Sequence, residues 1–331
     1  MTWPIARAIF AAAAVILLTR LVPPADVLGV LAGCSPGWLI VAAILLAAST
    51  MLGTISFRRL LAARGVNARF GAVLATDLAG HFYALSLPGG VVIGGAMRLL
   101  RLSGPRVSMA SVLSAIIASR LLDIVCGVLV AIAAFALIAN TLEDVRPWIA
   151  LLGAILLVAL LAYGMAISRG VRLWIVAALA RNPRMPPPLR RFARGALLRF
   201  ARTRRIDPRA EFPTILCLLA RHLVGGTALM ALLWAINVDL SYGAALWTRV
   251  VTGLVMLLPL SVAGLGIREG SLILLLAPFG VSSASAVAVS LVLLCYQLLL
   301  GAIGGLIELA SGLAPMRTLT GRRGSSDRGL G

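Results

Sequence analysis

The charged side chains of this sequence that could do chemistry lie where apolar runs are interrupted by proline and glycine. In one such run, Pro259 is followed by Gly264 and Gly266, and then directly by Arg268 and Glu269. A guanidinium beside backbone amides freed at a break can hold a phosphate through paired hydrogen bonds. We therefore interpret these five residues as a candidate binding site for an anionic substrate. The alternative is a buried ion pair between Arg268 and Glu269 that only braces the break.

A second break has a similar composition. Pro88 is followed by Gly94 and Gly95, and Arg98 comes soon after them. Proline cannot continue the hydrogen-bond ladder of a helix, and glycine lets the chain turn and pack closely. We expect these residues to contribute to the same kind of binding site. Arg98 either binds phosphate at the cytoplasmic mouth of this site or extends its charged head to the membrane surface.

Two further pairs of ionisable residues lie inside apolar stretches. Arg120 and Asp123 are spaced i, i+3, and Asp77 and His81 are spaced i, i+4, so each pair lies on one face of a helix. A charge at the centre of a membrane span costs at least about 2.5–3.5 kcal/mol, so it usually faces a cavity or a partner. These four residues are candidates for charge coupling, and histidine can relay protons near physiological pH. The alternatives are a structural ion pair in the first case and a packed polar stripe in the second.

Metal, redox and nucleotide chemistry have no matching pattern in the sequence. Its four cysteines are far apart, and it has only two histidines. This spacing predicts neither a metal site nor a disulfide, and we expect no cofactor. We find no Ser–His–Asp arrangement and no Walker-type phosphate-binding loop. We therefore expect that the protein is not an enzyme.

The elements that must position these residues are membrane helices. Of the 331 residues, 61% are hydrophobic and 12% are charged, and the mean hydropathy is +1.03. A soluble domain has about twice that charged fraction, and about 20 apolar residues cross a bilayer as a helix. Long apolar runs occur at 4–22, 37–56, 107–140, 147–168, 212–236 and 283–312. They predict an all-α polytopic membrane protein with six full spans.

The charges between these runs predict how the chain crosses the membrane. The formal net charge is +19, and all thirty basic residues are arginine. Arginines are concentrated in 57–70, 98–106, 169–211 and the C-terminal tail, whereas 23–36, 141–146 and 237–243 have one or none. Because positively charged connections stay in the cytoplasm, we expect both termini there, in a bacterial inner membrane. This distribution explains the basic composition without a nucleic-acid partner.

The stretches that contain the breaks, 71–97 and 244–280, lie between connections predicted to be on the same side of the membrane. Each is therefore predicted to be a re-entrant hairpin of two half-helices, the first from the cytoplasm and the second from outside. Three spans and a hairpin then repeat in opposite orientation, over about 1–140 and about 147–312. An inverted repeat with discontinuous helices is typical of transporters, with the substrate site near the middle of the membrane.

The connection at 169–211 is predicted to contain an amphipathic helix with arginines on its polar face. Such a helix either anchors the topology at the lipid headgroups or gathers substrate. We expect one transmembrane domain over 1–314, and a disordered basic tail on the cytoplasmic side over 315–331.

The breaks also resemble a known family. The run Leu87-Pro88-Gly89-Gly90 with Gly94-Gly95-Ala96-Met97-Arg98, preceded by Gly80, resembles the first signature of the flippase-like family, which is also named after the transmembrane region of lysylphosphatidylglycerol synthase. The run Leu258-Pro259-Leu260-Ser261-Val262-Ala263-Gly264-Leu265-Gly266-Ile267-Arg268-Glu269-Gly270 is similar to the second signature. Ser119-Arg120-Leu121-Leu122-Asp123 resembles the family's third span. Ala96 and Ser119 stand where members often have an acid, and the soluble synthase domain is not expected in this standalone member.

The resemblance implies lipid or glycolipid handling. We expect a translocase that moves the headgroup of an anionic or polyprenyl-linked lipid across the inner membrane. The alternative is an accessory membrane subunit of an envelope glycosyltransferase or lipid-modifying enzyme. The expected partners are membrane lipids, with a homodimer or an enzyme of envelope biosynthesis as further candidates.

Overall fold

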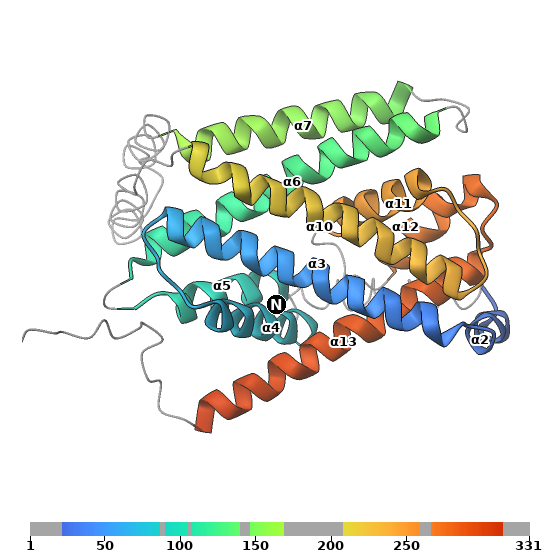
Figure 1. The fold of residues 1–331 in the computed structure, drawn as a ribbon, viewed down its shortest axis with the longest axis horizontal. Helices are drawn as coiled ribbons and strands as arrows, with labels where there is room; N and C mark the ends of the chain where they lie inside the picture. The colour runs from blue at the N-terminus through green and yellow to red at the C-terminus, as the bar shows by residue number, and fades with distance from the viewer. Residues whose placement is uncertain are drawn as a thin grey trace, which may run out of the picture.

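A computed structural model describes residues 22–86, 90–104, 107–139, 146–168, 208–257 and 266–313. Within these ranges the chain is helical, and no strand is present. The helices cross one another in a single bundle, and several of them run nearly its full length (Figure 1). The prediction of an all-α membrane protein is therefore confirmed.

The described residues contain five helices that are long and apolar enough to cross a membrane. They lie in α3 (Pro36–Ala63), α6 (Met109–Ile138), α7 (Arg146–Ile167), α10 (Pro208–Ala235) and α13 (Ser283–Leu313). Each of them overlaps a predicted span. The sixth predicted span, at 4–22, lies largely outside the described residues, as do most of the predicted amphipathic connection at 169–211 and the tail at 315–331. The predicted span at 212–236 agrees with the apolar segment Glu211–Ala235 of α10, and the helix itself begins slightly earlier, at Pro208, because proline fits the first turn of a helix.

Local sequence signals explain where α3 begins and ends. Pro36 follows the extended Ser35, and a proline in the first turn fits a helix start. After Arg64 the chain turns at Gly65, whose φ of 79° is in the left-handed region that glycine adopts readily. The short helix α2 (Pro24–Ala32) precedes α3, in a region predicted to be a connection.

The two broken stretches form two pairs of shorter helices. These are α4 (Phe70–Ser86) with α5 (Gly90–Leu102), and α11 (Tyr242–Val255) with α12 (Ile267–Leu276), the last followed by the short η2 (Ala277–Phe279). The first pair lies toward the end of the bundle where α3 ends, and the second lies toward the end where α3 begins (Figure 1). Pro88, Pro259 and Gly264 lie outside the described residues. The re-entrant path and the inverted repeat stay predictions.

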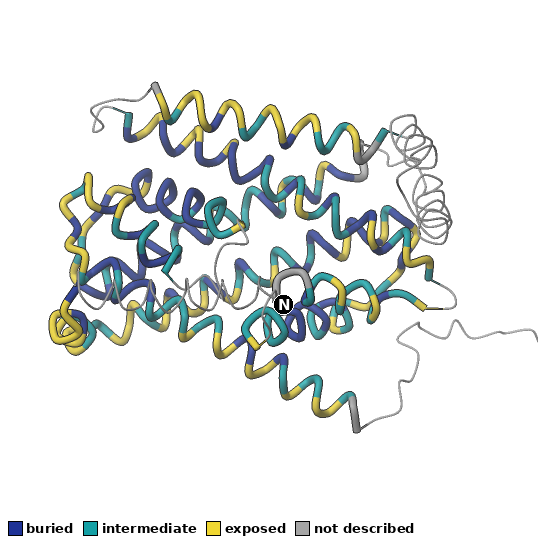
Figure 2. Tube along the Cα trace, turned by 180° about the vertical axis from the view of Figure 1, so that it is seen from behind, coloured by how far each residue is buried: buried dark blue, intermediate teal, exposed yellow. Residues whose placement is uncertain are grey.

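The largest apolar core forms around α6, α10, α11 and α12, with Leu229, Leu232, Trp247 and Leu276 among its buried residues. By contrast, α7 packs along α6 and exposes most of its surface (Figure 2). Its exposed side chains include Leu157, Val158 and Leu161, which suit contact with lipid tails.

Close packing of α13 against α4 depends on glycine. A Cβ atom added at Gly304 would lie 2.0 Å from the carbonyl oxygen of Leu78, and one added at Gly301 would lie 2.6 Å from Cδ1 of Leu85. The small-residue spacing Gly301-x-x-x-Gly305 favours close helix packing, either within a chain or between chains. In the structure, these residues pack within the chain.

Candidate functional site

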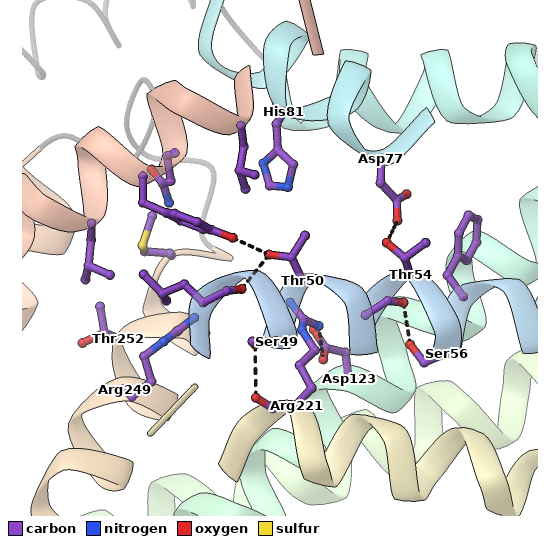
Figure 3. Close-up of a pocket in the computed structure, with 18 of the residues that line it drawn as sticks. Ser49, Thr50, Thr54, Ser56, Asp77, His81, Asp123, Arg221, Arg249 and Thr252 are labelled. Carbon is purple, nitrogen blue, oxygen red and sulfur yellow. Dashed lines mark hydrogen bonds and ion pairs between the residues drawn. The ribbon is translucent and has the colours of Figure 1, made fainter. Parts of the chain in front are cut away.

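A polar cavity of about 280 Å³ lies inside the bundle, between α3–α6 on one part of the chain and α10–α13 on the other. Hydroxyl groups of α3 and α11 line it, including those of Ser49, Thr50 and Thr252 (Figure 3). Its ionisable lining residues are Asp77, His81, Arg98, Arg120, Asp123, Arg221, Arg249 and Arg268. A polar cavity of this charge among membrane helices is a candidate binding site, because charges are stable there only beside partners, water or a ligand.

Arg98 and Asp77 join the first helix pair to α3. Nε of Arg98 lies 3.2 Å from Oδ1 of Asp77, and the hydroxyl of Thr54 donates a 2.8 Å hydrogen bond to the other carboxylate oxygen. Asp77 points from α4 toward Thr54 in Figure 3. The guanidinium of Arg98 also lies 5.8 Å from the centre of the Phe57 ring, within the range of a cation–π contact. Arg98 therefore lies in the cavity wall and is bound to an aspartate.

The close approach of α4 and α5 positions Arg98. A Cβ atom at Gly80 would lie 3.3 Å from Nε of Arg98, and one at Gly94 would lie 2.8 Å from the carbonyl oxygen of Gly80. Gly94 therefore serves helix packing, and neither it nor Gly95 is among the residues that line the cavity.

Asp123 of α6 pairs with two basic residues of α10. Its carboxylate accepts a 2.6 Å hydrogen bond from Nη1 of Arg221, and Nε2 of His222 lies 3.3 Å from the same oxygen. The predicted alternative of a structural ion pair between Arg120 and Asp123 is therefore wrong, because Asp123 pairs with Arg221 and His222 instead. The reason is that glycines let α10 come close. A Cβ atom at Gly127 would lie 3.2 Å from the ring of His222, and one at Gly53 would lie 3.3 Å from the guanidinium of Arg221.

Arg268 and Glu269 form a buried network at the start of α12. Their side chains are 2% and 6% exposed, and Nη2 of Arg268 lies 3.0 Å from Oε1 of Glu269. Arg268 also donates to Ser290 and Gln297 of α13, at 2.7 and 3.0 Å, and Ser290 donates to Glu269 at 2.6 Å. The network ties α12 to α13, as the bracing interpretation expects. Arg268 also lines the cavity.

The same glutamate caps α12. The backbone N–H of Gly266 donates a 2.7 Å hydrogen bond to Oε2 of Glu269, which satisfies a donor at the helix start. Gly266 has a φ of 82°, a conformation that residues with a side chain rarely adopt. Gly266 and Glu269 thus shape the break, and neither is among the residues that line the cavity.

Arg120 and Arg249 differ from the other arginines of the cavity. Neither forms a hydrogen bond or an ion pair with another residue that the structure describes, and Nε of Arg249 is buried without an acceptor there. Gly225 and Gly253 leave space for Arg249, since a Cβ atom at either would lie 3.6 or 3.4 Å from its guanidinium group. In the described part of the chain, these two arginines are the cavity's guanidinium groups without a bound partner.

Arg221 and Arg249 line the cavity, although neither was predicted to be a site residue. Arg249 is the only charged residue of 244–257, and this could have marked it, because an ionisable residue inside a membrane segment is a functional candidate. His81, predicted for charge coupling, lines the cavity from α4 together with Asp77. The described residues contain no cluster of His, Cys, Asp or Glu that could hold a metal ion.

The five long apolar helices of the described residues define a multi-pass membrane protein. The family described as the lysylphosphatidylglycerol synthase TM region matches residues 5–305, so the chain belongs to this family. The resemblance drawn from the two breaks is confirmed, and it gives the protein a lipid-related function in the membrane. The comparison with curated proteins found no match.

Proposed function

We propose that this protein is a lipid translocase of the bacterial inner membrane, which moves an anionic lipid headgroup across the bilayer. The observation that carries the proposal is the cavity, which brings five arginines together inside a membrane protein of a lipid-related family. Arginine is suited to phosphate, because its planar guanidinium can donate two parallel hydrogen bonds.

The volume of the cavity supports a headgroup rather than a whole lipid. At about 280 Å³ it is at the small end of the range for small-molecule sites. A phosphate with a small substituent fits this space, and long acyl or polyprenyl chains do not. In the proposed mechanism the tails therefore stay in the bilayer while the headgroup passes through the polar interior.

The two helix pairs supply the proposed movement. Arg98 belongs to one pair and Arg268 to the other, and each lies beside an acid of its own pair. If the pairs form an inverted repeat, alternate opening of the two ends would expose the cavity to each side in turn. Asp77, His81 and Asp123 would then respond to the headgroup or to protons. The proposal includes no covalent step.

Leaflet exchange in reconstituted liposomes tests the proposal. Purified protein should move tail-labelled phosphatidylglycerol, phosphatidic acid or polyprenyl phosphate between leaflets, measured by the fraction of label accessible to an external quencher. The Arg249→Gln variant should slow the exchange at least about tenfold, which corresponds to the loss of one charge-assisted hydrogen bond.

The matched control is Arg59→Gln, because Arg59 is an exposed arginine of α3 that does not line the cavity. It should exchange lipid at the wild-type rate. If the folded wild-type protein moves none of these lipids, translocation is refuted and the accessory-subunit function becomes the better candidate.

Cysteine accessibility tests the predicted paths of the two broken stretches. In a background without the four native cysteines, Gly95→Cys should react with a membrane-impermeant thiol reagent added from the cytoplasmic side. A side chain at Gly95 meets no atom within 4 Å, so the substitution fits. Gly264→Cys should react from the outer side. Labelling of Gly264→Cys only from the cytoplasm would contradict the outer hairpin.

A further inference from the structure

The cavity has more positively charged side chains than carboxylates to pair with them. Three of its arginines each lie against one carboxylate: Arg98 against Asp77 at 3.2 Å, Arg221 against Asp123 at 2.6 Å and Arg268 against Glu269 at 3.0 Å. These three pairs are neutral overall. Arg120 and Arg249 remain without a carboxylate among the described residues.

The two breaks cannot supply the missing carboxylates. Residues 87–89 and 258–265 contain no acidic side chain. Two of the other acids, Glu211 and Glu308, already face arginines outside the cavity, namely Arg64 and Arg101. Counted across the described residues and both breaks, the cavity with its paired acids therefore has two more positive charges than negative ones.

Both free arginines belong to the same charged cluster. Arg120 interacts electrostatically with Arg98, Arg221, Asp77 and Asp123, and Arg249 interacts with Arg221 and Asp123. Further along α11, the hydroxyl of Thr252 is buried without a hydrogen-bond partner among the described residues, and it lines the same cavity. Two guanidinium groups and a hydroxyl thus line the same cavity without a bound partner among the described residues.

We infer that the cavity selects a lipid headgroup with two negative charges, such as a terminal phosphate monoester. This inference rests on the proposed function and deepens it by naming the substrate class. A phosphate monoester carries about −1.5 to −2 charges at neutral pH, because its second pKa is near 6. Its charge matches the excess charge of the cavity, and its oxygens can accept charge-assisted hydrogen bonds from arginine.

Headgroups of other charge fit less well. A phosphate diester such as phosphatidylglycerol brings one negative charge and leaves one arginine uncompensated. A zwitterionic headgroup adds an ammonium to a site that is already positive, and a lysylated phosphatidylglycerol headgroup adds two amines. Charges inside a membrane protein are screened less than charges at its surface, so these differences in charge weigh more there.

Binding of tail-labelled lipids to the purified full-length protein tests the inference. The probes are phosphatidic acid, with a phosphate monoester, phosphatidylglycerol, with a diester, and phosphatidylcholine, with a zwitterion, all with the same tails. Phosphatidic acid should bind roughly tenfold to a hundredfold more tightly than phosphatidylglycerol, the ratio that one more charge-assisted interaction supports. Phosphatidylcholine should bind most weakly.

Substitutions separate charge from folding. The double variant Arg120→Gln/Arg249→Gln should bind phosphatidic acid and phosphatidylglycerol with about equal affinity, while Arg120→Lys/Arg249→Lys should keep a preference for phosphatidic acid. Arg59→Gln should bind all three lipids like the wild type. Equal binding of phosphatidic acid and phosphatidylglycerol by the wild type would overturn the inference.

Two further outcomes separate a failure of the charge selection from a failure of the proposed function. If the wild type moves lipids between leaflets but without preference for the monoester, the charge selection fails and the proposed function stands. If it binds none of the lipids, both fail. Inorganic phosphate, added as a competitor, should not displace phosphatidic acid. If phosphate alone displaces it, the site belongs to a free anion and the lipid assignment is wrong.

Discussion

Glu269→Ala is expected to lower the free energy of unfolding by about 3–5 kcal/mol, the usual cost of removing one partner of a buried ion pair. The side chain of Arg268 is 2% exposed, so without Glu269 its charge stays buried with no carboxylate beside it among the described residues. The variant also loses the hydrogen bonds that Glu269 accepts from Gly266 and Ser290. Thermal unfolding in detergent, followed by tryptophan fluorescence, measures the loss.

A double variant shows whether the unpaired charge is the cause. Arg268→Met/Glu269→Leu removes both charges and keeps the apolar volume, so it should be more stable than Glu269→Ala although it lacks the ion pair. Glu269→Gln, which keeps an acceptor for Gly266, should lie between Glu269→Ala and the wild type. If Glu269→Ala unfolds at the wild-type temperature, the pair does not stabilise the protein.

The sequence predicted this pair as one of two alternatives, because Arg268 and Glu269 are neighbours beside a break. The apolar runs likewise predicted the long helices, since the length and composition of a membrane helix are local properties. The breaks were visible for the same reason, because proline and glycine act on the backbone where they stand.

The partners of the other charges could not be predicted in this way. Asp123 binds Arg221, which is 98 residues away in the chain, rather than Arg120 on its own helix. That choice depends on how closely α10 approaches α6, and the approach depends on glycines such as Gly127 whose role appears only when the helices are packed. The free state of Arg249 follows from the same packing, because its neighbours come from other helices.

The site therefore combines local and long-range information. From the sequence, the arginines at the breaks were the candidates for binding a substrate, and in the structure both Arg98 and Arg268 are bound to acids. The arginines left over for a ligand, Arg120 and Arg249, lie inside α6 and α11, several residues away from the breaks. Residues close to the breaks thus supply two of the three paired arginines, Arg98 and Arg268, while positions inside the helices supply the two that remain available for binding.

Gly304→Ala is the second substitution with a large expected effect. The added Cβ atom would lie 2.0 Å from the carbonyl oxygen of Leu78 and 2.5 Å from its carbonyl carbon. Both atoms belong to the backbone of α4, so no side-chain rotation can relieve the contact, and α13 has to move away. We expect a loss of at least about 1–3 kcal/mol in the free energy of unfolding, the usual cost of overpacking.

Two other glycines provide a graded comparison by thermal unfolding in detergent. Gly301→Ala should be milder, because its closest contact is the flexible end of Leu85 at 2.6 Å. Gly270→Ala in α12 meets no atom within 4 Å and should be neutral or slightly stabilising, since alanine favours helix more than glycine does. The cavity-lining residues Tyr296 and Gln297 lie on α13 as well, so Gly304→Ala should also slow leaflet exchange. If Gly304→Ala proves as stable as Gly270→Ala, α13 does not pack against α4 at this distance.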